Sequence, residues 1–539
     1  MRASLPIRQK GNVLPYVLVL LTALLLAAQY VFNAYKASNE STRLQNTSDA
    51  AAYSVAAVYA QNYNFVALSN RALVANQITM AQVVTVVSWM RMTNTFAQTI
   101  NDIGQYIPYI SYITNIIEQI AAIASNIVEI AAPIIVGVVQ AYIYAVSAIQ
   151  AAAVPTTSVI AQEILAEVVE RNDKDIDYSF ATVATAAGAI AHLSELYGQN
   201  DCQEQANQVR DNGIEAGDAE TIARCMQFRN VTLASRDGFT KDRTYAMAPP
   251  GMPEKTKLDG VEADKVDGFV LYSELSMERA GGTTMSGETP DVPFTGWTAL
   301  DTLSMHSSTT YLEQKSPFSR PKQETSKHEE RVKLGVGHAY VGHECSRCHH
   351  IFHEKTNYWK KNPRGSACTD PDTENGYGGG EKSLNDGAFV LMDVLALNCS
   401  ELSEDYSESL NDSYSGDDNN AGLTKFYNLK TEGYVEEKDH LMIYLRKDRK
   451  DVRMQSETVG AGGNRVVLDR YKGAQNDAFH SAAAAAVYFR RGTDKWMLRS
   501  AKRLDGRMEF GNTYNPFWEP RLSKLTAAER ASLEIMKDL

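Results

Sequence analysis

The run VLVLLTALLLAAQYVF (residues 17–32) decides how the rest of the chain is placed. It lies within a longer segment, 11–35, that contains no charged residue. About 20 apolar residues are enough for a helix to cross the hydrocarbon core of a bilayer. A cleaved signal peptide has a shorter apolar region with small residues after it, whereas Gln29-Tyr30-Val31-Phe32 stands at that place here. Residues 11–35 are therefore predicted to form a retained transmembrane helix.

The distribution of charge predicts on which side of the membrane each part lies. Basic side chains precede the apolar run at Arg2, Arg8 and Lys10. Because such residues stay on the cytoplasmic side, residues 1–10 are predicted to be a cytoplasmic basic segment. The chain after residue 35 is predicted to lie outside the inner (cytoplasmic) membrane, which it crosses once. The net charge of -12 argues against a nucleic-acid-binding protein, which normally has a basic face.

Charge and hydrophobic pattern divide the remainder into a helical region, 36–230, and an α+β domain, 231–539, both extracytoplasmic. Residues 1–162 contain only twelve charged side chains, seven basic and five acidic, which is typical of membrane or tightly packed helix. Helix is predicted to continue from the membrane through residues 36–100 as a long stalk or bundle. Four apolar runs beyond residue 230 are typical of strands. They are FVLYSEL (269–275), VKLGVGHAYV (332–341), AFVLMDVLALN (388–398) and HLMIYL (440–445).

The uncharged segment 130–162 raises the alternative of a second membrane crossing, which would be centred on residues 130–152. Two prolines, Pro133 and Pro155, and several polar residues interrupt it. A second crossing would also return the six cysteines to the cytoplasm. The composition favours an extracytoplasmic helical bundle over a second crossing.

Isoleucine recurs every three or four residues through 103–134 and forms one face of a helix, here called the isoleucine stripe. The mean spacing is close to the ~3.5 residues of a coiled coil, which predicts that the stripe packs along a neighbouring helix. That helix could belong to the same chain or to another subunit, because periodicity shows only that a face is buried. The stripe consists of Ile103, Ile107, Ile110, Ile113, Ile117, Ile120, Ile123, Ile127, Ile130 and Ile134.

Residues 8–60 carry a series of motifs: RQKG (8–11), the apolar run, and RLQNTSDAAAYSVAAVYA (43–60). The series resembles the start of the TadG-like proteins of the Tad (tight adherence, Flp) pilus-assembly system. AAAAVYFRR (483–491) followed by YNPFWEPRL (514–522) is similar to a closing segment of proteins encoded with such systems. The resemblance implies a membrane-anchored, minor-pilin-like structural or assembly component whose partners are other pilus-assembly components. The matching positions are Arg8, Gln9, Gly11, Arg43, Leu44, Gln45, Asp49, Ala50, Ala51 and Ala52.

Two features of related proteins are not matched. Related pilins carry Glu five residues after the glycine at which they are processed, whereas Tyr16 stands at that distance from Gly11. Cleavage after Gly11 is therefore not expected. Some TadG-like proteins also carry a von Willebrand A domain, whose metal site needs D-x-S-x-S directly after a buried strand. DYSES (405–409) lies in a polar stretch instead, so no such metal site is predicted.

Six cysteines in an extracytoplasmic domain favour disulfides, because thiols oxidise outside the cytoplasm. Cys202 and Cys225 bracket a helical stretch and form the natural local pair. Direct closure of Cys345 to Cys348 would make a very small loop. The second group is therefore Cys345, Cys348, Cys368 and Cys399, whose three possible pairings the sequence does not distinguish.

The segment HECSRCHHIFH (343–353) carries a second hypothesis, a membrane-anchored redox or metal-binding protein. Its C-x-x-C-H spacing suits haem attachment, but a haem also needs a pocket and usually a second axial ligand. Zinc would find more than four possible ligands here, yet the second C-x-x-C of a zinc ribbon is missing. Disulfides remain the favoured interpretation, and no cofactor is predicted. The candidate metal ligands left open are His343, His349, His350 and His353.

Motifs of common enzyme families are missing from the sequence. There is no G-x-S-x-G, no H-E-x-x-H and no Walker A sequence. The glycine-rich GYGGGE (376–381) lies in a polar stretch without the strand–loop–helix context of a phosphate site. The chain is therefore predicted to be a structural or assembly protein, not an enzyme.

Overall fold

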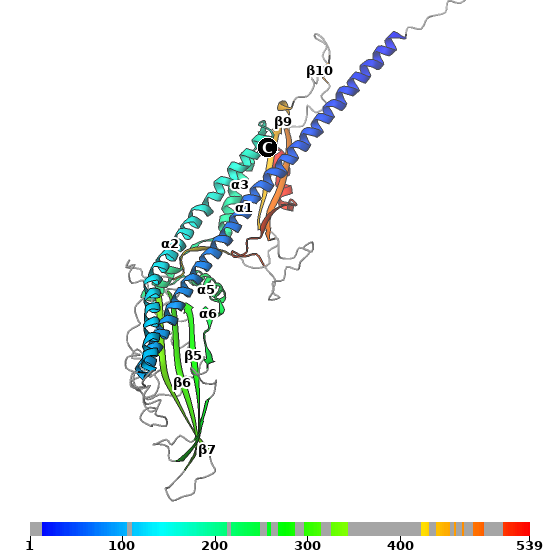
Figure 1. Cartoon of the computed structure of the whole chain (residues 1–539). Coiled ribbons are helices and arrows are strands. Elements are labelled where there is room, and N and C mark those ends of the chain that lie inside the picture. The colour runs from blue at the N-terminus through cyan, green and yellow to red at the C-terminus, as the bar shows by residue number, and fades with distance from the viewer. Residues whose placement is uncertain are drawn as a thin grey trace, which may run out of the picture. The chain divides into compact units, whose positions relative to one another are not determined.

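The structure is a computed structural model (Figure 1). It describes residues 13–104, 110–212, 217–247, 256–259, 268–285, 296–313, 325–342, 422–430, 438–452, 458–459, 466–467, 478–489 and 510–538.

Two long helices account for most of the described helical residues. Helix α1 (Leu14–Gly104) is 91 residues long and α2 (Ile110–Asn172) is 63 residues long. Pro15 lies in the first turn of α1 and Gly104 ends it, with no other proline or glycine between them. This arrangement favours an uninterrupted helix, because proline and glycine are the residues that break one. The prediction of helix through 36–100 is confirmed.

The chain forms two compact units, each assembled from segments far apart in the sequence. The unit here called the terminal unit comprises Met1–Leu68, Ala151–Gly198 and Tyr427–Leu539. The unit here called the central unit comprises Ser69–Gln150 and Gln199–Phe426. Each of the two long helices contributes residues to both units.

The terminal unit contains a four-stranded antiparallel sheet in the order β1-β9-β12-β13. Helix α3 (Ser179–Glu195) packs against β9, and α10 (Ala527–Asp538) follows the last strand. The core combines buried side chains of α1, α2 and α3 with those of the sheet. The strands are β1 (Ile176–Asp177), β9 (Lys438–Asp448), β12 (Ala478–Phe489) and β13 (Trp518–Ser523).

The central unit contains an antiparallel sheet in the order β3-β5-β6-β7, with β4 also paired to β5. Its strands are β3 (Tyr245–Met247), β4 (Thr256–Asp259), β5 (Gly268–Met285), β6 (Gly296–Glu313) and β7 (Thr325–Gly342). Its shorter helices are α4 (Cys202–Asn212), α5 (Ala219–Ala234) and α6 (Gly238–Lys241). A separate two-stranded ladder pairs β2 (Leu196–Asn200) with β8 (Phe426–Leu429). In the terminal unit, β10 (Thr458–Val459) pairs with β11 (Val466–Val467).

The α+β class, with a long apolar N-terminal helix, is confirmed. Three predicted strands are present, since 269–275 lies in β5, 332–341 in β7 and 440–445 in β9. The run 388–398 lies outside the described residues. The division between a helical region and an α+β domain at residue 230 stays a prediction.

Two glycines allow α1 to lie directly on β7 in the central unit. A Cβ atom on Gly335 would come within 2.6 Å of the carbonyl oxygen of Met92, and one on Gly337 within 1.8 Å of the carbonyl oxygen of Ser88. The Ser88 hydroxyl also donates to the carbonyl of Gly337 at 3.0 Å and ties the helix to the strand. Any larger residue at these positions would push the helix away from the strand.

Candidate interaction surfaces

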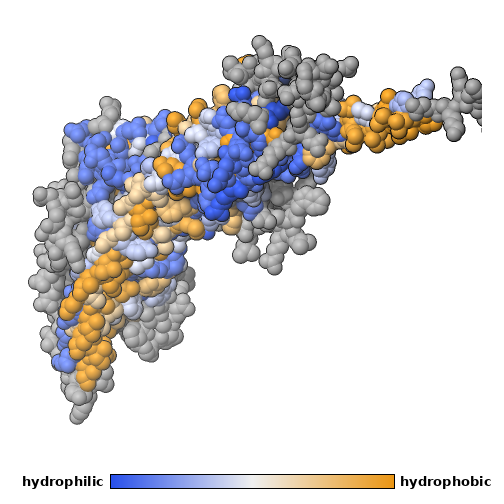
Figure 2. All heavy atoms as spheres, turned by 90° about the horizontal axis from the view of Figure 1, so that it is seen from above, coloured by the Kyte–Doolittle hydropathy of each residue, from blue (hydrophilic) through white to orange (hydrophobic). Residues whose placement is uncertain are grey.

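The first turns of α1 are apolar on all sides, and no other described segment of the chain covers them. Leu20, Leu24 and Val31 are 64%, 60% and 64% exposed, and the N-terminal helix is orange in Figure 2. A helix that is hydrophobic all round is buried in a large core or in a membrane. Among the described residues, two helices are long and apolar enough to cross a membrane, Leu14–Asn101 and Thr114–Asn172. None of the most apolar window of the first is buried inside the chain, against 22% for the second.

The motif segment that follows this apolar part forms the buried face of α1 in the terminal unit. Leu44 is 1% exposed, and Ala51 and Ala52 are fully buried. Ala50 is exposed, and Asp49 accepts a hydrogen bond from Gln45 Nε2 at 2.9 Å. The alanines have no side chain beyond Cβ, so neighbouring elements approach the helix backbone closely. The motif therefore has a packing role in this fold.

Gln45 and Ser48 join the motif segment to strand β12. Gln45 Nε2 donates to the carbonyl of Ala482 at 3.3 Å, and its Oε1 accepts from the Ser481 hydroxyl at 2.8 Å. The Ser48 and Ser481 hydroxyls are 2.6 Å apart, and both serines are buried. The N-terminal motif and the strand that carries the closing segment are thus parts of one structural site.

The second half of the closing segment is also attached to α1. Asn64 Nδ2 donates to the carbonyl of Trp518 at 2.9 Å, and the Trp518 N–H donates to Asn64 Oδ1 at 3.0 Å. One side-chain amide thus satisfies both backbone groups of a residue at the start of β13. The Trp518 ring is buried, with its centroid 4.9 Å from that of Tyr63.

The end of α2 is held in the terminal unit by a group of charges. Arg43 donates to the carbonyl of Asn172 and lies 3.5 Å from Asp173. Lys447 Nζ is 2.6 Å from Asp173 Oδ2 and 3.1 Å from Glu40 Oε2. Burial alone would lower the pKa of Lys447, but its hydrogen bonds to Asp173 and Glu40 raise it overall. The arginine of the motif therefore fixes the point at which α2 ends.

A polar cluster around His192 is buried in the core of the terminal unit. His192 Nδ1 lies 2.8 Å from Asp439 Oδ2, and Nε2 lies 3.1 Å from Asn62 Oδ1. The imidazole stacks on Tyr59 and meets Tyr63 edge-on, both at 4.7 Å between centroids. Burial, and then the Asp439 carboxylate, raise the pKa of both tyrosine hydroxyls, so both stay protonated at neutral pH. The cluster fixes α3 and β9 against α1 and carries no sequence motif.

Most of the described side chains of the isoleucine stripe point away from the chain. Six isoleucines and the valine that continues their spacing are 46–71% exposed, and together they are here called the exposed isoleucine face. Figure 2 shows a band of apolar side chains separate from the N-terminal helix. Packing against the described parts of the chain therefore does not cover this face. Its members are Ile117, Ile120, Ile123, Ile127, Ile130, Ile134 and Val138.

The side of α2 that packs within the central unit consists mainly of small residues. Thr114, Ala121, Ser125, Ala132 and Val136 are each no more than 8% exposed. An ordinary surface helix places its large apolar residues toward the core and its polar residues outward. Between residues 117 and 138 of α2, by contrast, the isoleucines of the exposed isoleucine face point outward.

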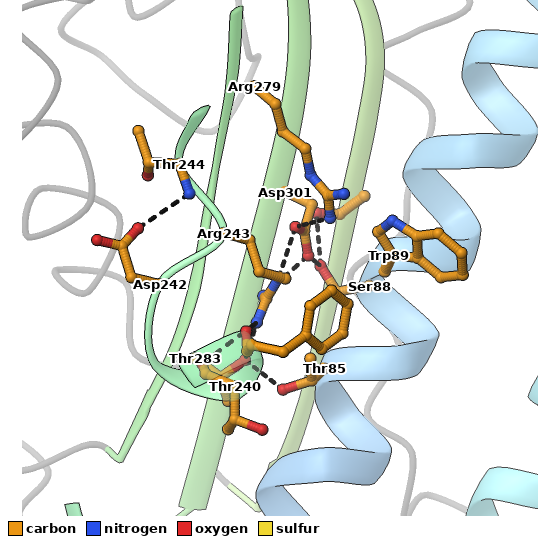
Figure 3. Close-up of polar contacts among 12 residues, drawn as sticks. Thr85, Ser88, Trp89, Thr240, Asp242, Arg243, Thr244, Arg279, Thr283 and Asp301 are labelled. Atoms are coloured by element: carbon orange, nitrogen blue, oxygen red, sulfur yellow. Dashed lines mark hydrogen bonds and ion pairs between the residues drawn. The ribbon is translucent and has the colours of Figure 1, made fainter. Parts of the chain in front are cut away.

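A buried ion cluster joins α1 to the sheet of the central unit (Figure 3). Asp301 on β6 is fully buried and accepts from Arg243 Nε and Nη2 at 2.8 and 2.9 Å. Arg279 Nη2 on β5 donates to Asp301 Oδ1 at 2.8 Å, and the Ser88 hydroxyl of α1 donates to Oδ2 at 2.8 Å. One carboxylate thus neutralises part of the charge of two arginines that are at most 5% exposed.

Further contacts fix the positions of these two arginines. Arg243 Nη1 donates to the carbonyl of Phe239 at 2.9 Å, and its guanidinium lies 5.4 Å from the ring centroid of that residue. The Arg279 guanidinium lies 5.9 Å from the Trp89 ring and 5.6 Å from the Tyr245 ring. The cluster is enclosed by side chains of the chain itself, which is typical of a structural role. No sequence motif marks the cluster, because its members lie in unrelated segments.

Asp237 holds the short helix α6 against α1. Its contacts predict that the stability of the fold depends on pH. Its side chain accepts from the Thr240 N–H at 2.9 Å and from Gln82 Nε2 at 3.0 Å. Burial alone would raise its pKa, but the hydrogen bonds from Gln82 and Thr240 lower it from 3.8 to about 2. A lowered pKa stabilises the fold above the unfolded-state pKa, and this contribution is lost as the pH falls through the folded-state pKa.

Asp237→Ala should therefore destabilise the central unit at pH 5, by about 1 kcal/mol, the usual cost of a lost N-cap. The difference from the unchanged chain should shrink as the pH falls from about 4 to about 2. Urea unfolding of the full chain in detergent micelles between pH 2 and pH 5 measures this difference. Gly238→Ala, in the same helix, changes no titratable group and is the control, so its effect should not converge with the unchanged chain in this way. A constant gap between the Asp237 variant and the unchanged chain over this range would contradict the assignment.

The structure joins one pair of the candidate cysteines. Cys202 and Cys225 form a disulfide with a Cα–Cα distance of 5.7 Å, which links the start of α4 to α5. The other candidates lie outside the described residues, as does the whole segment 343–353. Their pairing and the metal or haem alternative therefore stay predictions. No group of three or more potential metal ligands is present in the described part of the chain. The residues outside it are Cys345, Cys348, Cys368, Cys399, His343, His349, His350 and His353.

Helix α1 begins with an exposed apolar part, and its later part packs on a sheet. This arrangement is typical of membrane-associated proteins with an N-terminal anchor. Residues 11–58 match the model of the family described as Putative Flp pilus-assembly TadE/G-like, so the predicted resemblance of the N-terminal region is confirmed. The match covers both the apolar segment and the motif segment, and it supports a role related to Tad/Flp pilus assembly. No curated protein and no solved structure shows a significant match to the chain.

Proposed function

We propose that this chain is a membrane-anchored, minor-pilin-like structural component of a Tad/Flp-type pilus or adhesion system. The observation that carries the proposal is the family match over residues 11–58. That match ends within the part of α1 that is buried against the sheet of the terminal unit. A single helix thus supplies the apolar anchor and the central packing element of a folded unit. Such a protein acts by holding and presenting a folded body at the membrane, and it needs no catalytic site.

The proposed orientation places residues 1–10 in the cytoplasm and both folded units outside the inner membrane, with one crossing at 11–35. Three basic residues before the apolar segment and none within it support this orientation. The disulfide between Cys202 and Cys225 also supports it, since such bonds persist in oxidising compartments. The burial of part of α2 within the chain favours a single crossing over two.

The proposed partners are other pilus-assembly components or further copies of this chain, and the contact is made through the exposed isoleucine face. Large aliphatic side chains that no described part of the chain covers are a sign of an interaction site. The membrane is the partner of the N-terminal apolar segment, and nucleic acid is not proposed as a partner.

Protease treatment of intact spheroplasts tests the proposed orientation. With a tag at the C-terminus, the tag should disappear without lysis, while a cytoplasmic marker protein stays intact. A variant in which Arg2, Arg8 and Lys10 are changed to Glu is the matched control and should protect the tag in a larger fraction of molecules. A tag that is protected until lysis in the unchanged chain would overturn the proposal.

A further inference from the structure

We infer that the exposed isoleucine face binds the same face of a second copy of this chain, side by side and in parallel. The inference deepens the proposed function, and it rests on that proposal for the common orientation of the copies in one membrane.

The exposed isoleucine face has the size of a stable interface. Its seven side chains expose on the order of 700 Å², close to the ~800 Å² per partner that a standard protein interface buries. The largest apolar patch on a typical monomer is about 300–600 Å², and patches beyond this size mark interaction sites. The face is therefore large enough for a stable complex without any other contact.

The spacing of its residues matches the packing of one helix on another. From Ile117 to Val138 the face advances 21 residues in six steps, a mean of 3.5 residues, which is the coiled-coil value of ~3.5. Isoleucine at successive core positions favours parallel assemblies of identical helices, often of three or four strands. The inner side of α2 uses small residues for its own packing, so the isoleucines are free to interlock with a partner.

The chemistry of the face argues against a lipid surface as its occupant. Helices that lie on a membrane carry Lys and Arg on their polar side, which bind anionic headgroups. There is no Lys or Arg between Arg91 and Arg171, so α2 lacks these side chains along the whole face. The nearby Glu129 carboxylate is held 3.2 Å from Arg91 within the chain. Along this face α2 therefore offers no basic side chain that could bind anionic headgroups.

The face also suits an identical partner better than a different protein of high charge. Its seven members carry no charged or hydrogen-bonding side-chain group, so they offer nothing for a charged partner to pair with. Two such faces are complementary to each other without any change, because β-branched side chains interlock in the gaps between their equivalents. With both anchors in one membrane the helices run parallel, and each residue lies opposite its own equivalent.

Cysteine cross-linking of the full chain in intact membranes tests this geometry. In Ile127→Cys the new thiol lies opposite its own equivalent in the second copy. Mild oxidation should therefore give a cross-linked product with twice the mass of one chain, which is 59.5 kDa. This product should disappear on reduction. Asn126→Cys is the matched control, because the residue is exposed but points about 100° around the helix axis. We expect at least fivefold more cross-linked product for position 127 than for 126, after subtraction of the product given by the six native cysteines.

A second set of variants keeps the test decisive. Ile120→Cys alone is the reference, and a second variant combines it with Ile130→Asn and Ile134→Asn. The second variant should cross-link severalfold more slowly, because polar groups would then be buried between the copies. These positions are exposed in the single chain, so the variants should fold and be cleaved outside spheroplasts like the unchanged chain. Equal products at 126 and 127, or a product that contains a different protein, would overturn the inference. Both results leave the topology test unchanged, so failure of this inference is distinguishable from failure of the proposed function.

Discussion

Replacing Asp301 with asparagine should lower the free energy of unfolding of the central unit by roughly 3–5 kcal/mol, the usual cost of removing one partner of a buried ion pair. The Asp301 carboxylate is fully buried and accepts from Arg243, Arg279 and Ser88. Asparagine keeps the shape but removes the negative charge, and two guanidinium groups are then buried without a counter-charge. Urea unfolding of the full chain in micelles, followed by hydrogen exchange in peptides from β6, measures the loss.

The control for this experiment is the same chemical change at a surface ion pair. Glu220 pairs with Arg224 at 3.5 Å, and the Glu220 side chain is 74% exposed. Glu220→Gln should change the free energy of unfolding by less than about 1 kcal/mol, because solvent screens exposed pairs. If the Asp301 and Glu220 variants unfold at the same urea concentration, the ion cluster does not hold α1 on the sheet.

Replacing Gly337 with alanine should destabilise the same unit by about 3 kcal/mol, at the upper end of the range for an over-packed site. The added Cβ would lie 1.8 Å from the Ser88 carbonyl oxygen and 2.5 Å from the Met92 N atom, and both belong to the backbone. Because backbone atoms cannot rotate away as a side chain can, α1 must move off β7. Hydrogen exchange in peptides covering residues 85–100 and 332–341 should rise together.

Gly238→Ala is the matched control for this substitution. Nothing lies within 4 Å of the position that its Cβ would take, and the residue is in the first turn of α6. Alanine has a higher helix propensity than glycine, so this variant should be neutral or more stable by up to about 1 kcal/mol. A Gly337 variant as stable as the Gly238 variant would show that α1 does not lie on β7 as closely as described.

The long helices and several strands were predictable because their signals are local. The apolar segment before residue 35 and the lack of glycine and proline between Pro15 and Gly104 together indicate one long helix. Runs such as 332–341 and 440–445 have the length and β-branched content of strands. These signals depend only on neighbours in the chain, so no tertiary contact has to be known.

The ion cluster and the glycine contacts were not predictable, because each depends on pairs of residues far apart in sequence. Asp301 lies 58 residues from Arg243 and 213 from Ser88, and nothing in its own segment shows that it is buried. Gly335 and Gly337 were read only as part of a strand, whereas their role comes from the helix that lies on them. The isoleucine stripe showed an apolar face, but only the structure shows that the chain leaves its described part uncovered.

The contact between Gln45 and Ala482 has a consequence for the order in which the protein is made. These residues are 437 positions apart, and at synthesis rates of about 5–20 residues per second the later one follows after roughly 20–90 s. During that time the apolar side of α1 around Leu44 and Ala51 has no sheet to cover it. The terminal unit can therefore fold only when synthesis of the chain is nearly complete, and a chain stopped before β12 should remain a target for chaperones and proteases.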